Sequence, residues 1–213
     1  VDYLAEEILN QQTPRIQRFL KQTAILSRLS PALCDAVTES TDSQVLLERL
    51  ASLNLFVIAL DDERHWYRYH HLFADLLRHR LLKESPSLVE GGGTWDIARL
   101  HERASQWFER HGLLTEALDH ALAGKDFGRA IRLIESAAMP LMSRGQWVTV
   151  RRWLDALPTE VLLRQAQLCF WYGWALGFTG QIAAAERPLQ AAEAVWQAAN
   201  NQARLGELFV LRA

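Results

Sequence analysis

Apolar positions in the C-terminal half of the chain recur with a helical period, and a longer repeat overlies it. Gly112, Gly145 and Gly180 are 33 and 35 residues apart. Two positions after each glycine stands an apolar residue: Leu114, Trp147 or Ile182. Five positions after it stands Ala117, Val150 or Ala185. A period of about 34 residues with a small residue at each helix crossing is typical of stacked helix hairpins. Such arrays bind partners, so the pattern favours a docking scaffold over an enzyme.

From Trp95 onward the pattern predicts only helices, and their short, glycine-marked connections favour antiparallel neighbours. The expected helices cover residues 96–111, 114–123, 126–142, 146–157, 161–179, 182–199 and 202–213. Pro158 suits a helix start, whereas Pro188 falls inside a helix and predicts a local kink.

The N-terminal 84 residues have a mixed pattern that begins with helices. Thr13-Pro14 and Ser30-Pro31 are predicted helix starts, because Thr or Ser can cap a helix and Pro is tolerated in its first turn. A further helix is expected over residues 42–54. Its inward positions are Val45, Leu46, Leu50 and Leu53.

Two strands and a closing helix follow. The strands are predicted at residues 56–60 and 65–69, with the polar residues 61–64 as their turn, and the closing helix contains Leu72 to Leu81. Three helices, a β-hairpin and another helix are the element order of a winged-helix domain. We therefore expect a mainly α chain, with a winged helix over residues 1–88 and a helical region over 89–213. A linker is expected at 85–94, because three successive glycines, Gly91 to Gly93, disfavour a packed element.

Composition adds few constraints. Hydrophobic residues make up 49% of the chain and the formal net charge is −2, so there is no overall attraction toward nucleic acid or anionic lipid. No apolar run approaches the roughly 18 residues of a membrane span, and Cys34 and Cys169 suit free thiols in a cytoplasmic protein. Both ends lie within helical patterns, so we interpret the chain as part of a longer protein.

The sequence contains no constellation typical of catalysis or of metal binding. His71 and Asp75 share a helix face, but two ligands without a nearby cysteine are a poor metal site. No phosphate-binding G-x-x-x-x-G-K-[ST] motif occurs. We expect no catalytic residue, no metal and no cofactor held by this chain alone.

One repeat unit resembles the tetratricopeptide pattern. Its matching residues are Gly173, Leu176, Gly180, Ile182, Ala185, Leu189 and Ala192. The earlier units match only in part, and Ser105 stands where the first unit would have the glycine of its first helix. The resemblance implies degenerate repeats that build an irregular superhelix.

Two longer stretches are more specific. They are residues 66–78, WYRYHHLFADLLR, and residues 100–117, which include Ala104-Ser105-Gln106-Trp107-Phe108 and His111-Gly112. With Gln17 to Leu20 and Leu47 to Leu50, they resemble the MalT-like family of large LuxR-type, ATP-dependent bacterial transcription regulators, which are signal-transduction ATPases with numerous domains. The resemblance implies that this chain holds the winged helix, a helical arm and the start of a superhelical sensor.

The same resemblance implies partners and a cofactor. The ATPase domain that binds ATP or ADP would precede this chain and contact its winged helix. A small-molecule or protein inducer would bind the superhelix, DNA would be bound only by a C-terminal domain outside this chain, and no membrane contact is expected. His70, in Tyr69-His70-His71-Leu72, matches a histidine that contacts an ADP phosphate in related ATPases, although His71 replaces their following aspartate. An imidazole donor at a helix N-terminus is a suitable anion ligand.

Two other features have alternative interpretations. The region from Arg64 to Lys83 is basic with interspersed aromatics, which suits an acidic domain surface or nucleotide phosphates; the alternative is a DNA-binding winged-helix factor with a helical oligomerisation domain. Trp171 and Trp174, three apart on one helix, could line a ligand or partner groove, or fill the core between helix layers.

Overall fold

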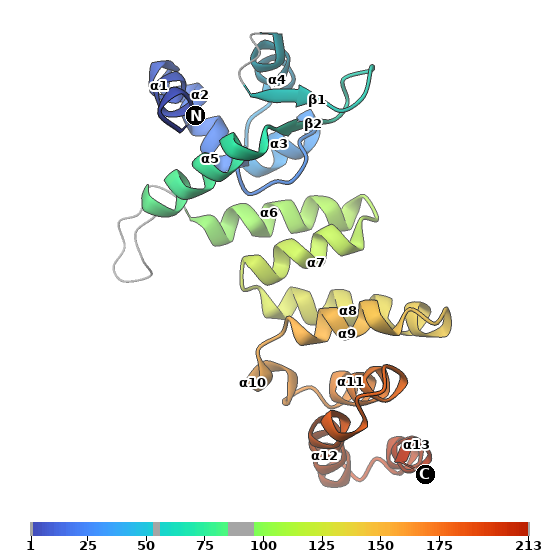
Figure 1. Ribbon diagram of the computed structural model, residues 1–213. Helices are drawn as coiled ribbons and strands as arrows, with labels where there is room; N and C mark the ends of the chain where they lie inside the picture. Colours follow the sequence, from blue (N-terminus) through green and yellow to red (C-terminus); the bar gives the residue numbers. More distant parts are fainter. Residues whose placement is uncertain (1, 53–55, 85–95, 213) are drawn as a thin grey trace. The chain divides into compact units, whose positions relative to one another are not determined.

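The computed structural model describes residues 2–52, 56–84 and 96–212, and its contacts divide the chain into two compact units, Val1–Gly124 and Lys125–Ala213 (Figure 1). Each unit is described by itself. The predicted linker and the predicted boundary at residue 88 lie outside the described residues, so the boundary stays a prediction.

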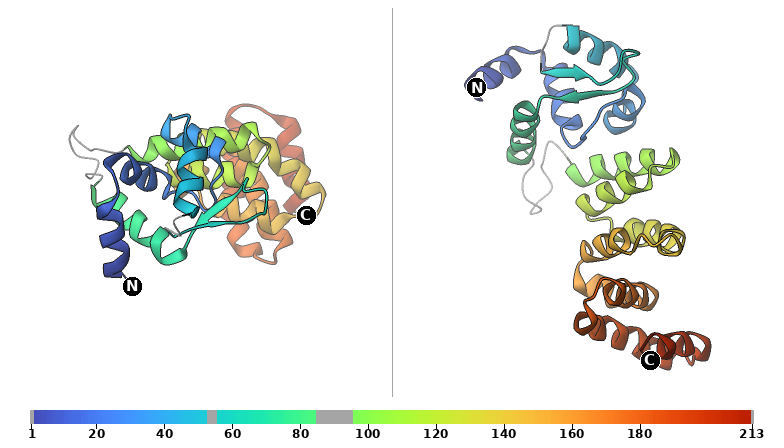
Figure 2. Two further views of the ribbon diagram at one scale, coloured as in Figure 1. Left: turned by 90° about the horizontal axis from the view of Figure 1, so that it is seen from above. Right: turned by 45° about the vertical axis from the view of Figure 1, so that its right-hand side comes forward.

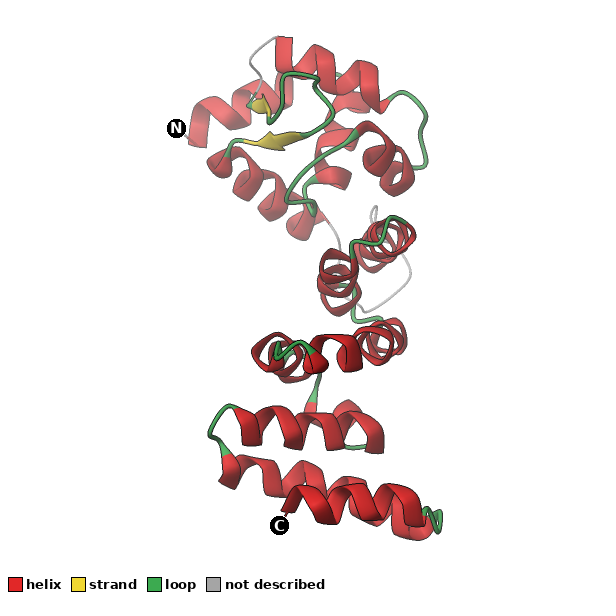
Figure 3. Ribbon diagram, turned by 90° about the vertical axis from the view of Figure 1, so that its right-hand side faces the viewer, coloured by secondary structure: helices red, strands yellow, loops and turns green. Residues whose placement is uncertain are grey.

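The first unit is a winged helix joined by a helix hairpin, as expected for a mainly α chain. Its elements are α1 (Asp2–Gln11), α2 (Pro14–Thr23), α3 (Pro31–Thr38), α4 (Ser43–Ser52), β1 (Val57–Ala59), β2 (Tyr67–Tyr69), α5 (His71–Glu84), α6 (Ile97–Arg110) and α7 (Leu114–Ala123). The strands are antiparallel with Ile58 opposite Arg68, and Leu29 adds a bridge to the other side of Tyr67. The small sheet lies among helices, as the yellow strands in Figure 3 show.

Local signals account for these helices. The side chains of Thr13 and Ser30 accept hydrogen bonds from the amides of Ile16 and Leu33, so both predicted caps are confirmed. On α4, Leu46 and Leu50 are buried as predicted, but Val45 is 65% exposed, so its inward placement was wrong. Leu47 is fully buried instead, because the buried stripe runs through residues 43, 46, 47 and 50. Leu53 lies outside the described residues.

The second unit consists of α8 (Phe127–Ser143), α9 (Trp147–Asp155), α10 (Thr159–Leu162), α11 (Ala166–Phe178), α12 (Ile182–Ala198) and α13 (Gln202–Arg212), which Figure 2 shows from two sides. The single helix predicted over residues 161–179 was wrong, because the chain leaves α10 at Leu163 and restarts at Ala166. Pro188 lies inside α12, and the kink predicted there stays a prediction.

The periodic glycines lie just after the ends of helices and not at the points where helices cross. Gly112, Gly145 and Gly180 follow α6, α8 and α11 with φ of 72°, 75° and 79°, and nothing lies within 4 Å of where their Cβ atoms would be. In this left-handed conformation glycine closes a helix without steric strain. The small residue at the crossing of α11 and α12 is Gly173, whose Cβ would lie 2.4 Å from Leu189.

Candidate functional site

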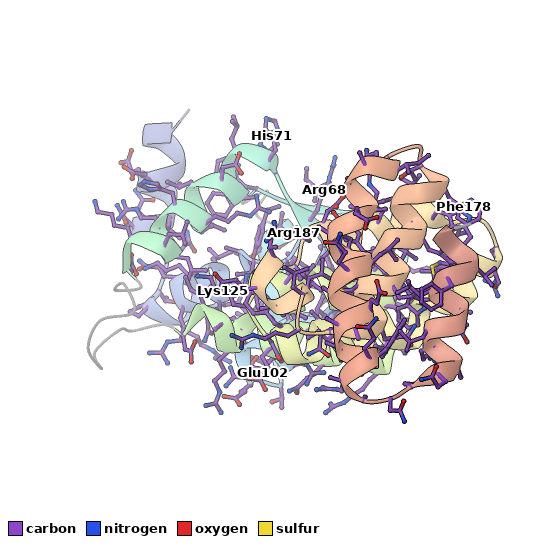
Figure 4. The ribbon with its side chains drawn as sticks, turned by 90° about the horizontal axis from the view of Figure 1, so that it is seen from below. Arg68, His71, Glu102, Lys125, Phe178 and Arg187 are labelled. Carbon is purple, nitrogen blue, oxygen red and sulfur yellow. The ribbon has the colours of Figure 1, made fainter. Side chains whose placement is uncertain are left out.

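His70 lies where the β-hairpin meets α5. Its amide donates to the carbonyl of Phe56 over 2.8 Å, and its carbonyl accepts from the amide of Ala74 over 2.9 Å, so its backbone joins strand and helix. The half-buried His70 ring lies 4.4 Å from the ring of His71, which is exposed and points away from the ribbon (Figure 4). An imidazole donor is therefore present at the N-terminus of α5.

The basic region is partly neutralised by its neighbours. Arg78 pairs with Asp75 over 3.0 Å, Arg80 with Glu6 over 2.8 Å and His65 with Glu63 over 3.2 Å. The exposed basic side chains for which the described residues show no ion pair are Arg64, Arg68, His71, His79 and Lys83. The positive surface is thus smaller than the sequence suggested.

A second site, which the sequence did not reveal, joins the winged helix to the hairpin α6–α7. Arg28, in the segment after α2, extends its guanidinium 2.6 Å from the carboxylate of Glu116 on α7. Its Cζ atom lies 4.4 Å from the ring centre of Trp66, which precedes β2, so the cation also contacts an aromatic face.

Arg103 makes the corresponding contact from α6. Its guanidinium donates to the carbonyl of Val37 over 3.0 Å and lies 2.5 Å from the carboxylate of Glu39. Val37 is in the last turn of α3, and Glu39 ends that helix with φ of 55°. A cation at a helix C-terminus is favourable, because the last carbonyls carry partial negative charge and lack partners within the helix.

Aromatic rings continue the same contact. Trp66 meets Trp107 of α6 edge to face with centroids 6.5 Å apart, and Trp107 stacks on His111 at 3.8 Å. Helix α6 also packs against α3. The sequence stretches that carry the family resemblance contain both tryptophans but give no sign that Trp66 and Trp107 meet.

Inside the hairpin, the buried His120 pairs with the half-buried His101. Their Nδ1 atoms are 2.8 Å apart, and His120 stacks on Phe108 with centroids 5.4 Å apart. Burial lowers the pKa of His120 to about 4, with a contribution from His101, and burial also lowers the pKa of His101. Both rings are neutral at pH 7, so that one Nδ1 donates and the other accepts.

The two tryptophans predicted to line a groove lie in different environments. Trp171 is buried, whereas Trp174 is half-buried and contacts Phe170, Trp147 and Phe178 at centroid distances of 5.4, 5.7 and 6.4 Å. Phe178 is 64% exposed at the end of α11 (Figure 4). A ligand groove here stays a prediction.

The described residues contain no group of three or more His, Cys, Asp or Glu side chains placed to hold a metal ion. Within the same ranges, no helix has both the length and the apolar character needed to cross a bilayer.

Comparison with known proteins addresses the family. Residues 5–89 match the model of the MalT winged helix domain. The match covers α2 to α5 with the β-hairpin between them. The resemblance inferred from residues 66–78 and their neighbours is therefore confirmed, and the β-hairpin β1–β2 lies where a winged helix has its wing.

Relatives extend the similarity beyond this domain. The chain is 28% identical to the HTH-type transcriptional regulator MalT of Cronobacter sakazakii over 212 residues, which are 100% of this chain and 23% of the relative. It is 29% identical to MalT of Yersinia pestis over 177 residues, 81% of the chain and 18% of that relative. It is also 33% identical to the serine/threonine-protein kinase PknK of Mycobacterium tuberculosis over 174 residues, 82% of the chain and 15% of the kinase.

The chain thus spans less than a quarter of the length of these relatives. The similarity to these differently named proteins extends beyond the matched winged-helix region into the helices that follow it. What those proteins do as wholes concerns this chain only as a proposal.

Proposed function

We propose that this chain is the signal-relay and inducer- or partner-binding segment of an ATP-dependent, LuxR-type, MalT-like transcriptional regulator in the cytoplasm. A small molecule or protein binds the helical region, and the winged helix passes the change to an ATPase domain. The observation that carries the proposal is the attachment of α6–α7 to the winged helix through Arg28 and Arg103. Signal transfer also requires that the bound ligand prefer one domain arrangement.

The repeated hairpins support a tetratricopeptide-like scaffold. At the crossing of α11 and α12, Gly173 admits Leu189 where any Cβ would collide. In the first hairpin Ser105 takes the corresponding place, fully buried, and its hydroxyl donates to the carbonyl of Ala117 over 2.7 Å. Hairpins packed this closely present long surfaces suited to binding a partner.

His70 is the proposed contact to the nucleotide. ADP bound to the ATPase domain would place a phosphate against the imidazole at the N-terminus of α5, where helix amides also favour an anion. Release of this contact would then couple inducer binding to nucleotide exchange.

The test replaces His70 in the full-length protein that contains this chain. His70→Asn keeps a residue suited to helix capping but removes the imidazole, and should weaken ADP retention about tenfold, as expected for a lost hydrogen bond to a charged group. His79→Asn, at an exposed position on the same helix, is the matched control and should retain ADP. Retention would be measured as the dissociation rate of a fluorescent ADP analogue, and equal rates in the two variants would refute the role of His70.

A second candidate is the same relay segment within a protein-kinase regulator. The 33% identity to PknK over 82% of the chain favours it. The complete open reading frame separates the candidates: a phosphate-binding ATPase motif upstream and a helix-turn-helix downstream support the first, whereas a kinase domain supports the second.

A further inference from the structure

We propose that the helical hairpin α6–α7 is a fixed extension of the winged-helix domain, held by Arg28 and Arg103, so that hairpin and winged helix move as one body. Its importance for signalling rests on the relay function proposed above. The mechanical claim stands on the contacts alone.

Arg103, on α6, caps the C-terminal end of helix α3 of the winged helix. Helix α3 has only eight residues, and its final carbonyls have no partners within the helix. The guanidinium of Arg103, 17% exposed, donates to the carbonyl of Val37 and pairs with Glu39 just beyond the helix end. The C-terminus of α3 is therefore capped by a side chain of α6.

Arg28 fixes the other helix of the hairpin. It reaches from the winged helix to Glu116 on α7, and Trp66 covers its cation. Each helix of the hairpin is thus tied by an arginine to a different segment of the winged helix, and one arginine comes from each side. A single attachment would let the hairpin rotate about it, whereas two separated attachments oppose that rotation.

Apolar contact adds to these attachments. Helix α6 packs on α3, and Trp66 meets the edge of Trp107. The two ion pairs are partly exposed and contribute little alone, so the arginines orient the hairpin while packing supplies most of the stabilisation. The compact unit accordingly extends to Gly124, 35 residues beyond the matched domain end at residue 89.

Native-state hydrogen exchange on the whole chain, followed by mass spectrometry across a denaturant series, tests the proposal. We expect the amides of α6 and α7 to open together with those of α2–α5, at the same free energy and denaturant dependence. Hairpin amides that instead open with α8–α12, or on their own, would overturn the proposal.

Variants test the attachments. Arg103→Gln, alone and with Arg28→Gln, should raise exchange about tenfold in both α3 and α6–α7 and leave α11–α12 unchanged. Arg103→Lys keeps the charge and should restore part of the protection. Arg204→Gln, which breaks only a local pair with Glu207 on α13, is the control. Faster exchange confined to the hairpin would show that α3 does not depend on it and would contradict the proposal.

The same variants separate this inference from the relay function. In the full-length protein, coupled exchange together with a dissociation rate of a fluorescent ADP analogue that none of the variants alters would refute the relay and leave the fixed hairpin intact. Independent opening of the hairpin would refute the fixed extension whatever the dissociation rate of the ADP analogue.

Discussion

The imidazoles of His101 and His120 meet inside the first helix hairpin with 2.8 Å between their Nδ1 atoms. This contact needs one N–H donor and one bare nitrogen, so two protonated rings would repel each other. Only 9% of His120 is exposed, and the ring lies against Phe108, which leaves an added charge poorly solvated. Glu102, next to His101 on α6, is exposed and accepts a hydrogen bond from Gln106, and Glu116, four residues before His120 on α7, is half-buried and pairs with Arg28.

The pair makes stability depend on pH. Because the pKa of His120 is about 4 in the folded protein, below the ordinary histidine value of 6.5, its contribution to stability is complete above pH 6.5 and is lost as the pH falls toward 4. We expect the first unit to lose about 3 kcal/mol of unfolding free energy over this interval. Urea unfolding at a series of pH values, with hydrogen exchange of α6–α7 as the probe, measures the unfolding free energy of the wild type and of His120→Gln. Parallel pH profiles for the two proteins would contradict the prediction.

Of the site residues, His70 could be predicted from the sequence, whereas Arg28 and Arg103 could not. His70 was placed correctly at the start of a helix, because strand and helix patterns meet there. Arg28 and Arg103 were not recognised, because their partners Glu116 and Val37 are 88 and 66 residues away. One sequence contains no signal for such pairs, since an arginine at these positions has the same local pattern whether it faces solvent or another element.

At the scale of elements, the crossing of α11 and α12 depends on Gly173. A Cβ at this position would lie 2.4 and 2.5 Å from Cδ2 and Cγ of the buried Leu189, whereas nothing lies within 4 Å of a Cβ at Gly177, one turn later on the same helix. Gly173→Ala should therefore destabilise the chain by about 1–3 kcal/mol, because overpacking exceeds the gain in helix propensity. Gly177→Ala should stabilise it by about 0.5–1 kcal/mol. Thermal unfolding of both variants measures these values, and equal shifts of the same sign would show that Leu189 gives way freely.

Helices were predicted well wherever a chemical stop or start marks them. Thr13-Pro14, Ser30-Pro31 and the three periodic glycines all lie at observed helix ends. The break between α10 and α11 was missed because Leu163, Arg164 and Gln165 are all good helix formers. Tertiary contact decides there: Cys169 is buried, and its thiol donates to the carbonyl of Leu162 over 3.2 Å, which holds the end of α10 against α11. The strands proved shorter than predicted, in part because Phe56 has φ of 57° and cannot extend β1.

At the scale of the whole molecule, charge decides between the proposed relay and a DNA-binding winged helix. The net charge is −2, and Arg78 and Arg80 of the basic region already pair with carboxylates. Non-specific DNA binding needs several free cations on one face, because affinity comes from the counterions that they release. Of the exposed arginines and lysines in this region, the described residues leave Arg64, Arg68 and Lys83 without an ion pair.

We therefore expect no DNA complex at micromolar concentrations of this chain in 50 mM salt. A gel-shift titration with duplexes of mixed sequence, repeated from 50 to 200 mM salt, measures this directly. Arg68→Gln is the informative variant, because Arg68 is exposed on β2 at the centre of the wing, and Arg204→Gln in the second unit is its control. A complex that weakens steeply with salt, and that Arg68→Gln alone disrupts, would establish the wing as a DNA contact and displace the relay from its proposed role. Absence of binding leaves this surface available to an acidic domain or a nucleotide phosphate, which is the chemistry that the relay requires.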